Sequence, residues 1–226
     1  YRSTAMGSGT RASGNSATAM GGYTTASGRS STAMGTRTTA QPYAALVIGQ
    51  WNTIAGTTGS WVVTDPLFVA GNGSSTSARS NALTLLKNGN MTIAGTLTQN
   101  SDARLKRDIE PLDGVLSKLD GISGVTYRFQ DETTHPAGLQ VGLLAQQVQE
   151  AFPELVSEGP DGTLSVAYGK FAAVLLEAMH EQQEQIEERD AEVAQLRAEL
   201  AKVREEQNDR LARLEALITA GDEKAK

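Results

Sequence analysis

The sequence predicts an oligomeric protein of several parts: an N-terminal β-roll or β-prism stalk of Gly/Ser/Ala repeats, an α+β domain, and a long coiled-coil helix. Two observations carry this prediction. The first 40 residues repeat with a period of 14, and the residues after position 168 place apolar side chains at seven-residue spacing. A thin coil and a helix with one apolar stripe bury little surface within a single chain, so both features predict association between copies.

The repeat is clearest in the motif Thr-Ala-Met-Gly, which occurs at residues 4–7, 18–21 and 32–35. Repetition at a fixed period indicates stacked coils, each covering the apolar face of its neighbour. The predicted core residues are Ala5, Met6, Ala19, Met20, Ala33 and Met34. The alternative, a disordered Gly/Ser linker, does not explain why the motif keeps its phase. The pattern resembles the head repeats of YadA-like trimeric adhesins, which implies a left-handed parallel β-roll over residues 1–40 that serves as a stalk or attachment surface.

Residues 41–100 are interpreted as a β-rich neck of short strands separated by turns. Trp51 and Trp61 stand near β-branched residues, which favours positions in the core or at a subunit interface over a role in ligand stacking. Asn88-Gly89, flanked by alternating apolar and polar residues, predicts a hairpin over residues 81–95. A lone hairpin is marginal in water, so a neighbouring chain is expected to cover it.

Residues 101–168 are predicted to form a compact α+β unit. Apolar spacing predicts a helix over residues 109–119, and alternation predicts a strand over residues 125–129. A second helix is expected over residues 145–151, ending at Phe152-Pro153, because the residue before a proline avoids the α region. Asp161-Gly162 predicts the turn of a second hairpin.

Residues 169–220 are predicted to form one coiled-coil helix, followed by a tail over residues 221–226. Apolar residues recur there in two rows with period seven, which is the pattern of a coiled-coil seam. The first row holds Met179, Ile186, Val193, Leu200 and Leu214, and the second holds Leu196, Val203 and Leu217. Polar residues interrupt both rows and are expected to fix register and strand number at some cost in stability; they are Gln182, Arg189, Gln207 and Arg210. The alternative is a single solvated helix with a charged face.

Four blocks of sequence after position 100 are similar, in order, to the endosialidase-type intramolecular chaperone domain at the C-termini of phage tail spikes and tail fibres. The blocks are Ser101–Ile109, Gly142–Val148, Phe152–Val156 and Val166–Tyr168, the last followed by the long helix. In the fourth block, Ala167 departs from the family, in which aspartate is usual at this position. The resemblance implies a module that trimerises, templates folding of the β-stalk before it, and cuts the chain between Asn100 and Ser101. The predicted fold class is therefore a multi-part trimer.

The resemblance also implies Ser101 as the nucleophile and Lys106 as its general base. A serine hydroxyl is a weak nucleophile until a base takes its proton. A lysine, with a reference pKa of about 10.4, takes a proton only when burial or nearby positive charge has made it neutral, and Arg104 or Arg107 is expected to assist. Asp102 opposes this if it points at Lys106; otherwise it caps a turn or orients Arg104. On an ideal helix, residues five apart lie about 140° from each other, so a dyad needs a turn or bend between its members. The alternative makes Ser101 a helix N-cap and leaves Lys106 solvated.

Composition limits the remaining classes of function. The net charge of −6, the pI near 5.0 and the lack of an evident basic patch argue against nucleic acid as a partner. The absence of cysteine excludes disulfides and thiolate metal sites, two histidines argue against a His-rich metal site, and no cofactor is expected. No apolar run reaches the roughly 18 residues of a membrane span.

The expected partners are two further copies of the chain, upstream tail fibre or baseplate components, and a cell-surface receptor. The expected location is a virion tail fibre or extracellular particle assembled in the host cytoplasm. The chain opens inside a repeat without a signal peptide, which predicts the C-terminal part of a longer protein. The main alternative is a bacterial trimeric surface adhesin with a non-cleaving trimerisation domain. An enzyme acting on an external substrate is disfavoured, because no paired carboxylates stand out and His135 and His180 are expected at the surface.

Overall fold

The computed structural model of the chain describes residues 2–224, with side chains described as far as residue 214. It divides into two compact units, Tyr1–Arg107 with Thr126–Val141, and Asp108–Val125 with Gly142–Lys226. The predicted residue Leu217 and the end of the predicted tail, residues 225–226, lie outside the described side chains and the described residues, respectively.

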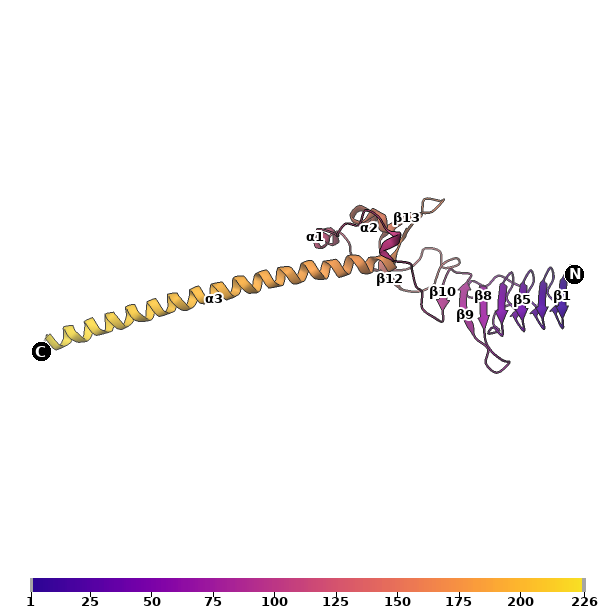
Figure 1. The fold of residues 1–226 in the computed structure, drawn as a ribbon, viewed down its shortest axis with the longest axis horizontal. Coiled ribbons are helices and arrows are strands. Elements are labelled where there is room, and N and C mark those ends of the chain that lie inside the picture. Colours follow the sequence, from indigo (N-terminus) through magenta and orange to yellow (C-terminus); the bar gives the residue numbers. More distant parts are fainter. Residues whose placement is uncertain (1, 225–226) are drawn as a thin grey trace. The chain divides into compact units, whose positions relative to one another are not determined.

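The first unit is a stack of β-coils, as the 14-residue repeat predicts (Figure 1). The ten strands within residues 2–107 are β1 (Thr4–Ser8), β2 (Arg11–Ala12), β3 (Thr18–Gly22), β4 (Thr25–Ala26), β5 (Thr32–Thr36), β6 (Thr39–Ala40), β7 (Leu46–Gln50), β8 (Pro66–Asn72), β9 (Asn81–Leu86) and β10 (Met91–Ile93). One sheet runs in the order β1-β3-β5-β7-β8-β9-β10 and a second in the order β2-β4-β6. Thr4 pairs in parallel with Thr18, and Thr18 with Thr32, so each repeat lies on the one before it in register.

The core of the roll is a column of small residues. Ala19, Ala26, Ala33 and Ala40 are fully buried, and Val47 and Val69 continue the column into the neck. The prediction that Met6, Met20 and Met34 join this core is wrong: Met6 is 58% exposed and Met34 is 38% exposed, and Met20 is half-buried. Successive side chains of a strand point to opposite faces, so an alanine that faces inward sends the following methionine outward. Ala5, in the first coil, is also exposed.

A column of glycines lets the coils approach closely on one edge. Gly21 has φ +112°, and a Cβ added there would lie 2.1 Å from the carbonyl oxygen of Gly35 in the next coil. Only glycine tolerates both the backbone conformation and the contact. The same relation holds for Gly7 with Gly21 and for Gly35 with Gly49.

The β2-β4-β6 sheet ends at a buried asparagine. Asn52 Oδ1 accepts from the backbone N–H of Thr39 at 2.7 Å, and Asn52 Nδ2 donates to the carbonyl of Thr39 at 3.0 Å. The side chain thus satisfies the two backbone groups that a further strand would have satisfied, and it leaves no open sheet edge there.

The predicted hairpin is present but is not alone. β9 and β10 pair antiparallel about Asn88-Gly89, and β9 also pairs antiparallel with β8, so the hairpin extends the large sheet within the same chain. The hairpin is therefore not isolated, and its coverage by a neighbouring chain stays a prediction. Neither tryptophan is a core residue: Trp61 is 52% exposed and Trp51 is half-buried.

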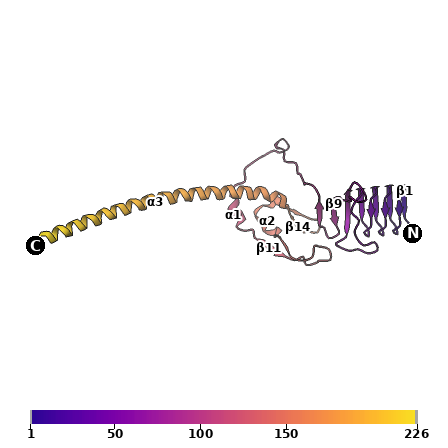
Figure 2. The same cartoon turned by 90° about the horizontal axis from the view of Figure 1, so that it is seen from below.

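The second unit packs short elements against one long helix (Figure 2). These are α1 (Val115–Leu119), α2 (Ala145–Ala151), the antiparallel hairpin β13 (Val156–Glu158) and β14 (Leu164–Val166), and α3 (Phe171–Lys224). Short 3₁₀ turns span Pro153–Leu155 and Tyr168–Lys170. A further two-stranded sheet holds β11 (Gly124–Tyr127) and β12 (Gln140–Leu143). The predicted second helix and second hairpin are confirmed. The long C-terminal helix is also confirmed, and it continues to Lys224 through most of the predicted tail.

The core of this unit gathers apolar residues from α1, α2 and the first turns of α3. Its buried members are Val115, Val148, Phe152, Leu155, Phe171, Val174 and Ala178. The predicted helix over residues 109–119 is wrong in its first half. Residues 109–114 are not helical, and α1 begins only after Gly114, which has φ +63°. Pro111 and this left-handed glycine interrupt the helix, and Ile109 is 68% exposed.

The short helix α1 is held by a side chain from α3. Glu181 Oε1 and Oε2 accept from the backbone N–H groups of Val115 and Leu116, each at 2.8 Å, at the N-terminus of a helix that has no local side-chain cap. These backbone hydrogen bonds hold the pKa of Glu181 below its usual range. One carboxylate thus joins two segments 65 and 66 residues apart in sequence.

Replacing Glu181 with glutamine is expected to lower the melting temperature at neutral pH, because an amide offers one acceptor oxygen for two N–H donors. Since the pKa of Glu181 is lowered on folding, its contribution is present above the unfolded pKa of about 4.3 and is lost as the pH falls through the folded pKa. Thermal melts from pH 7 to pH 3 measure this: wild type and E181Q should converge in acid. The matched control is Glu184→Gln, on the exposed surface of α3. Equal melting temperatures for E181Q and wild type at pH 7 would contradict the capping role.

Candidate active site

The segment around Ser101 forms the bend that a dyad requires. Residues 96–100 have no regular structure, a 3₁₀ turn spans Ala103–Leu105, and Lys106 returns to extended backbone with φ −113° and ψ 153°. The turn is too short and too tight to continue as an α-helix, so the 140° separation of an ideal helix does not apply. The alternative in which Ser101 is the helix N-cap is not what the structure shows, because Asp102 occupies that position.

This bend brings the two predicted catalytic residues together. Lys106 Nζ donates to Ser101 Oγ at 2.8 Å. Both side chains are exposed on this single chain. The distance lies within the range in which a proton passes between a nucleophile and its base.

Asp102 and Arg104 form a separate pair. Asp102 Oδ1 accepts from the backbone N–H of Arg104 at 2.9 Å, and Arg104 Nη2 donates to Asp102 Oδ2 at 2.6 Å. Hydrogen bonds from the Arg104 side chain, and then from its backbone, hold the pKa of the Asp102 carboxyl below its usual range. Asp102 therefore caps the turn and orients Arg104, and its carboxylate forms an ion pair with Arg104.

The other titratable residues considered from the sequence do not join this segment. His135 is exposed and stacks on Phe129, with ring centroids 4.6 Å apart, and His180 is exposed on α3 beside Glu177. Within residues 2–224, no group of three or more His, Cys, Asp or Glu side chains is placed to hold a metal ion. No helix in this described part of the chain is long and apolar enough to cross a membrane.

Comparison with known proteins matches both halves of the chain. Residues 101–157 match the family described as chaperone of endosialidase, which is a peptidase family. Residues 1–24 and 26–50 match two copies of the YadA head domain repeat. Both resemblances are confirmed. The match begins at Ser101 itself, and the second repeat match reaches residue 50, the end of β7.

A third match comes from a phage structural protein. A stretch of 66 residues is 38% identical to the long tail fiber protein Gp37 of Escherichia phage AR1, covering 27% of this chain and 6% of that protein. The chain thus spans a small fraction of the length of this relative. It is a tail-fibre-like chain with an endosialidase chaperone domain and YadA head repeats.

A second cluster, on the β-roll, is absent from the sequence predictions. Arg37 and Arg79 place their guanidinium groups over aromatic rings of Tyr23 and Trp51. The sequence does contain a signal for it, because residues 9, 23, 37 and 51 are spaced by 14 and occupy the same corner of successive coils.

Proposed function

We propose that this chain is the C-terminal part of a trimeric phage or phage-like tail fibre. In this proposal, residues 101–226 gather three copies, guide folding of the β-stalk, and then cut the bond between Asn100 and Ser101. The observation that carries the proposal is the 2.8 Å contact between Lys106 Nζ and Ser101 Oγ, at the residue where the chaperone family match begins.

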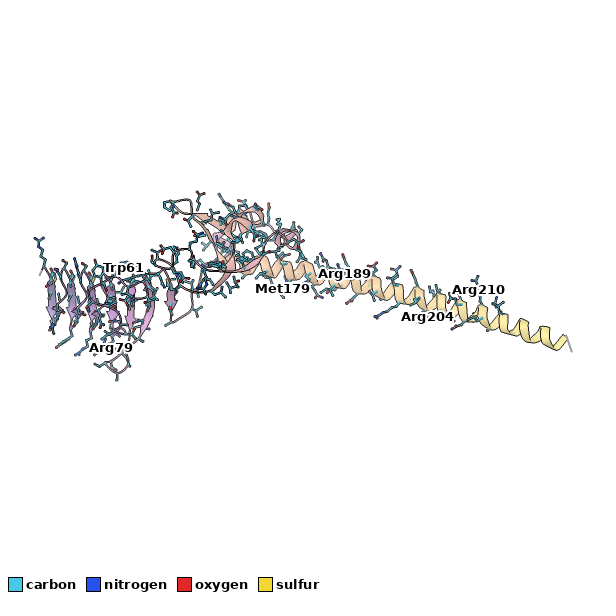
Figure 3. The ribbon with its side chains drawn as sticks, turned by 180° about the vertical axis from the view of Figure 1, so that it is seen from behind. Trp61, Arg79, Met179, Arg189, Arg204 and Arg210 are labelled. Atoms are coloured by element: carbon cyan, nitrogen blue, oxygen red, sulfur yellow. The ribbon has the colours of Figure 1, made fainter. Side chains whose placement is uncertain are left out.

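The surface of α3 supports trimerisation. Both predicted heptad rows lie along a helix that is continuous from Phe171 to Lys224. Among the side chains described as far as residue 214, their apolar members are exposed, for example Met179 67%, Leu196 55% and Leu200 51%. Figure 3 shows Met179, Arg189 and Arg210 along this helix. A helix that exposes such rows over its length is stabilised when partner helices cover them.

The outward face of the seven-stranded sheet also supports association. Register places Leu46 beside Phe68, and Phe68 beside Leu85, on the face opposite the buried Val47 and Val69. The exposed Met6 and Met34 lie on this same outward face in the earlier coils. An apolar face that continues from coil to coil fits a second copy of the same roll, in register.

A folding helper is needed because of how such a stalk assembles. Three flexible Gly-rich strands have to come into register before contacts between them stabilise anything, which is slow. A C-terminal coiled coil that forms early raises the local concentration of the strands and aligns them. Cleavage afterwards removes the helper and leaves the stalk kinetically trapped.

The chemistry of the cut follows from the dyad. Neutral Lys106 accepts the proton of the Ser101 hydroxyl, and Oγ attacks the carbonyl carbon of Asn100 through a five-membered ring. The proton then passes to the amide nitrogen of Ser101 as the C–N bond breaks, which leaves an ester between Asn100 and Ser101 Oγ. Water hydrolyses this ester to the Asn100 carboxylate and a chain with a free amine at Ser101. Burial of the dyad between protomers would supply the low-dielectric surroundings that a neutral lysine needs.

The proposal is tested on the full chain by a denaturing gel after heating. Two fragments of 100 and 126 residues, with Ser101 as the new N-terminus, are expected. A second sample of residues 1–100 alone is expected to yield no soluble trimer when it is expressed without the helper. A single full-length band contradicts the cut, and a soluble trimer of the isolated stalk contradicts the chaperone role.

A further inference from the structure

The net charge of −6 is the sum of two parts of the chain that carry opposite net charges. Residues 1–100 contain one acidic residue, Asp65, and six basic ones: Arg2, Arg11, Arg29, Arg37, Arg79 and Lys87. Their net charge is therefore +5 (6 − 1), and that of residues 101–226 is −11 (14 basic minus 25 acidic). The roll and neck form a basic body, although the whole chain is acidic, and this predicts an anionic partner for that part.

Part of this charge is organised into a ladder along one edge of the roll. The ladder consists of Tyr23, Arg37, Trp51 and Arg79. Arg37 Cζ lies 4.5 Å from the ring centroid of Tyr23 and 4.9 Å from that of Trp51, and Arg79 Cζ lies 5.2 Å from that of Trp51. Cations that contact aromatic rings in this way are held in place rather than left mobile in solvent. Figure 3 shows Arg79 and Trp61 on opposite edges of the roll.

The backbone places these side chains at a cost. Tyr23, Arg37 and Trp51 have φ of 55°, 53° and 44°, in the left-handed region that bulky residues rarely adopt. The other left-handed corner of each coil holds small residues, Ser16, Ser30 and Ala44. A small residue would suit the ladder corner equally well, and the first coil does hold Gly9 there, with φ +64°. Bulky side chains in a strained position point to a role beyond folding.

The ladder has the groups of an anion-binding site, and no carboxylate among residues 2–214 pairs with Arg37. Arg79 Nη1 donates to the carbonyls of Asn52 and Arg37, at 3.0 and 3.4 Å, so its position is fixed by the backbone. Arg37 is exposed, and among residues 2–214 its side chain has neither a hydrogen-bond acceptor nor a carboxylate partner. The aromatic rings contact the flat faces of the Arg37 guanidinium. Its N–H groups, which lie along the edge of that plane, are therefore able to bind a carboxylate bidentately.

We propose that this ladder binds a linear acidic polysaccharide through its carboxylate groups. The rungs follow the stacking direction of the coils, so the donors lie in a line that suits a chain with regularly spaced charges. Thr36, next to Arg37 in sequence, and Thr53, two residues after Trp51, are exposed, and their hydroxyl groups are able to donate hydrogen bonds to a sugar. Nucleic acid fits less well, because single-stranded bases need open aromatic faces for stacking and both rings here already contact guanidinium groups. This inference does not depend on self-cleavage.

The test measures binding of the full chain to polygalacturonate, with neutral dextran and duplex DNA as comparison ligands. Wild type is expected to bind polygalacturonate, with affinity falling as salt rises, and to bind dextran and DNA at least about 10-fold more weakly. Arg37→Ala should weaken binding by about 10-fold or more, and Arg37→Lys by less, since charge without the planar fork gives a weaker contact. The matched control is Arg11→Ala, which removes the same charge from an exposed residue of β2 that contacts no aromatic ring within residues 2–214.

A second readout guards against loss of folding. Trp51 and Trp61 are the two tryptophans of the chain, so Trp61→Phe leaves Trp51 as the sole reporter, and its emission should shift with polygalacturonate and not with dextran. Circular dichroism melts identify any variant that fails to fold. The proposal is overturned if wild type does not bind polygalacturonate at low salt, if R37A and R11A lose equal affinity, if DNA binds more tightly, or if Trp51 emission does not respond.

Discussion

Ser101→Ala is expected to abolish cleavage of the Asn100–Ser101 bond. Without Oγ, residue 101 has no nucleophile that can attack the Asn100 carbonyl carbon through a five-membered ring. Removal of a covalent nucleophile lowers rates by several orders of magnitude. On a denaturing gel the variant should run as one band, while wild type gives fragments of 100 and 126 residues. Intact mass spectrometry of the same samples locates the cut.

Lys106→Arg tests whether Lys106 acts as a base or only as a positive charge. Arginine keeps the positive charge and the ability to donate to Ser101 Oγ, but it cannot lose its proton in a protein. Cleavage is therefore expected to stop while the oligomer still forms, as size-exclusion chromatography would show. Lys118→Arg, the same change on α1, serves as the control and should cut normally. Wild-type cleavage by K106R would refute Lys106 as the general base.

Leu196→Lys combined with Leu200→Lys is expected to convert the proposed trimer to monomers and to leave the stalk unassembled. Both leucines lie on the exposed apolar rows of α3. Burying a leucine side chain is worth about 1.5–3 kcal/mol, and each change acts in all three helices and adds a like charge to the seam. Analytical ultracentrifugation measures the mass of the variant, and turbidity at about 350 nm detects aggregated stalk.

The matched control adds the same two charges outside the seam. Ala194→Lys combined with Ala198→Lys places lysines at exposed positions of the same two helical turns. These positions face solvent in a coiled coil with this register, so the control should remain trimeric. Equal behaviour of the two double variants would contradict the heptad assignment.

The sequence predicted most elements whose signal is local. The 14-residue period, Asn88-Gly89, and the stop of α2 before Pro153 depend on turn chemistry or repetition, and the structure follows them. The sequence-based predictions were wrong where the direction of a side chain or the tertiary context determines the structure. Period counting does not show whether Met34 or Ala33 faces inward, and apolar spacing from Ile109 onward does not show that Gly114 adopts a left-handed conformation.

The candidate site was found through resemblance and not through spacing. A serine and a lysine five residues apart are unremarkable by themselves, and only the 3₁₀ turn over Ala103–Leu105 brings Ser101 and Lys106 into contact. The ladder on the roll, by contrast, was not predicted, although its spacing is present in the sequence. Its period was visible in the sequence, but Tyr23, Arg37 and Trp51 differ in type, so the column emerges only when the coils are stacked.

The most direct test is the mass of the Ser101→Ala chain in solution, by multi-angle light scattering with the cut disabled. Trimerisation predicts a single species at three times 23.9 kDa, about 72 kDa. A species near 24 kDa whose circular dichroism shows a stably folded β-roll would contradict the claim that three copies are needed.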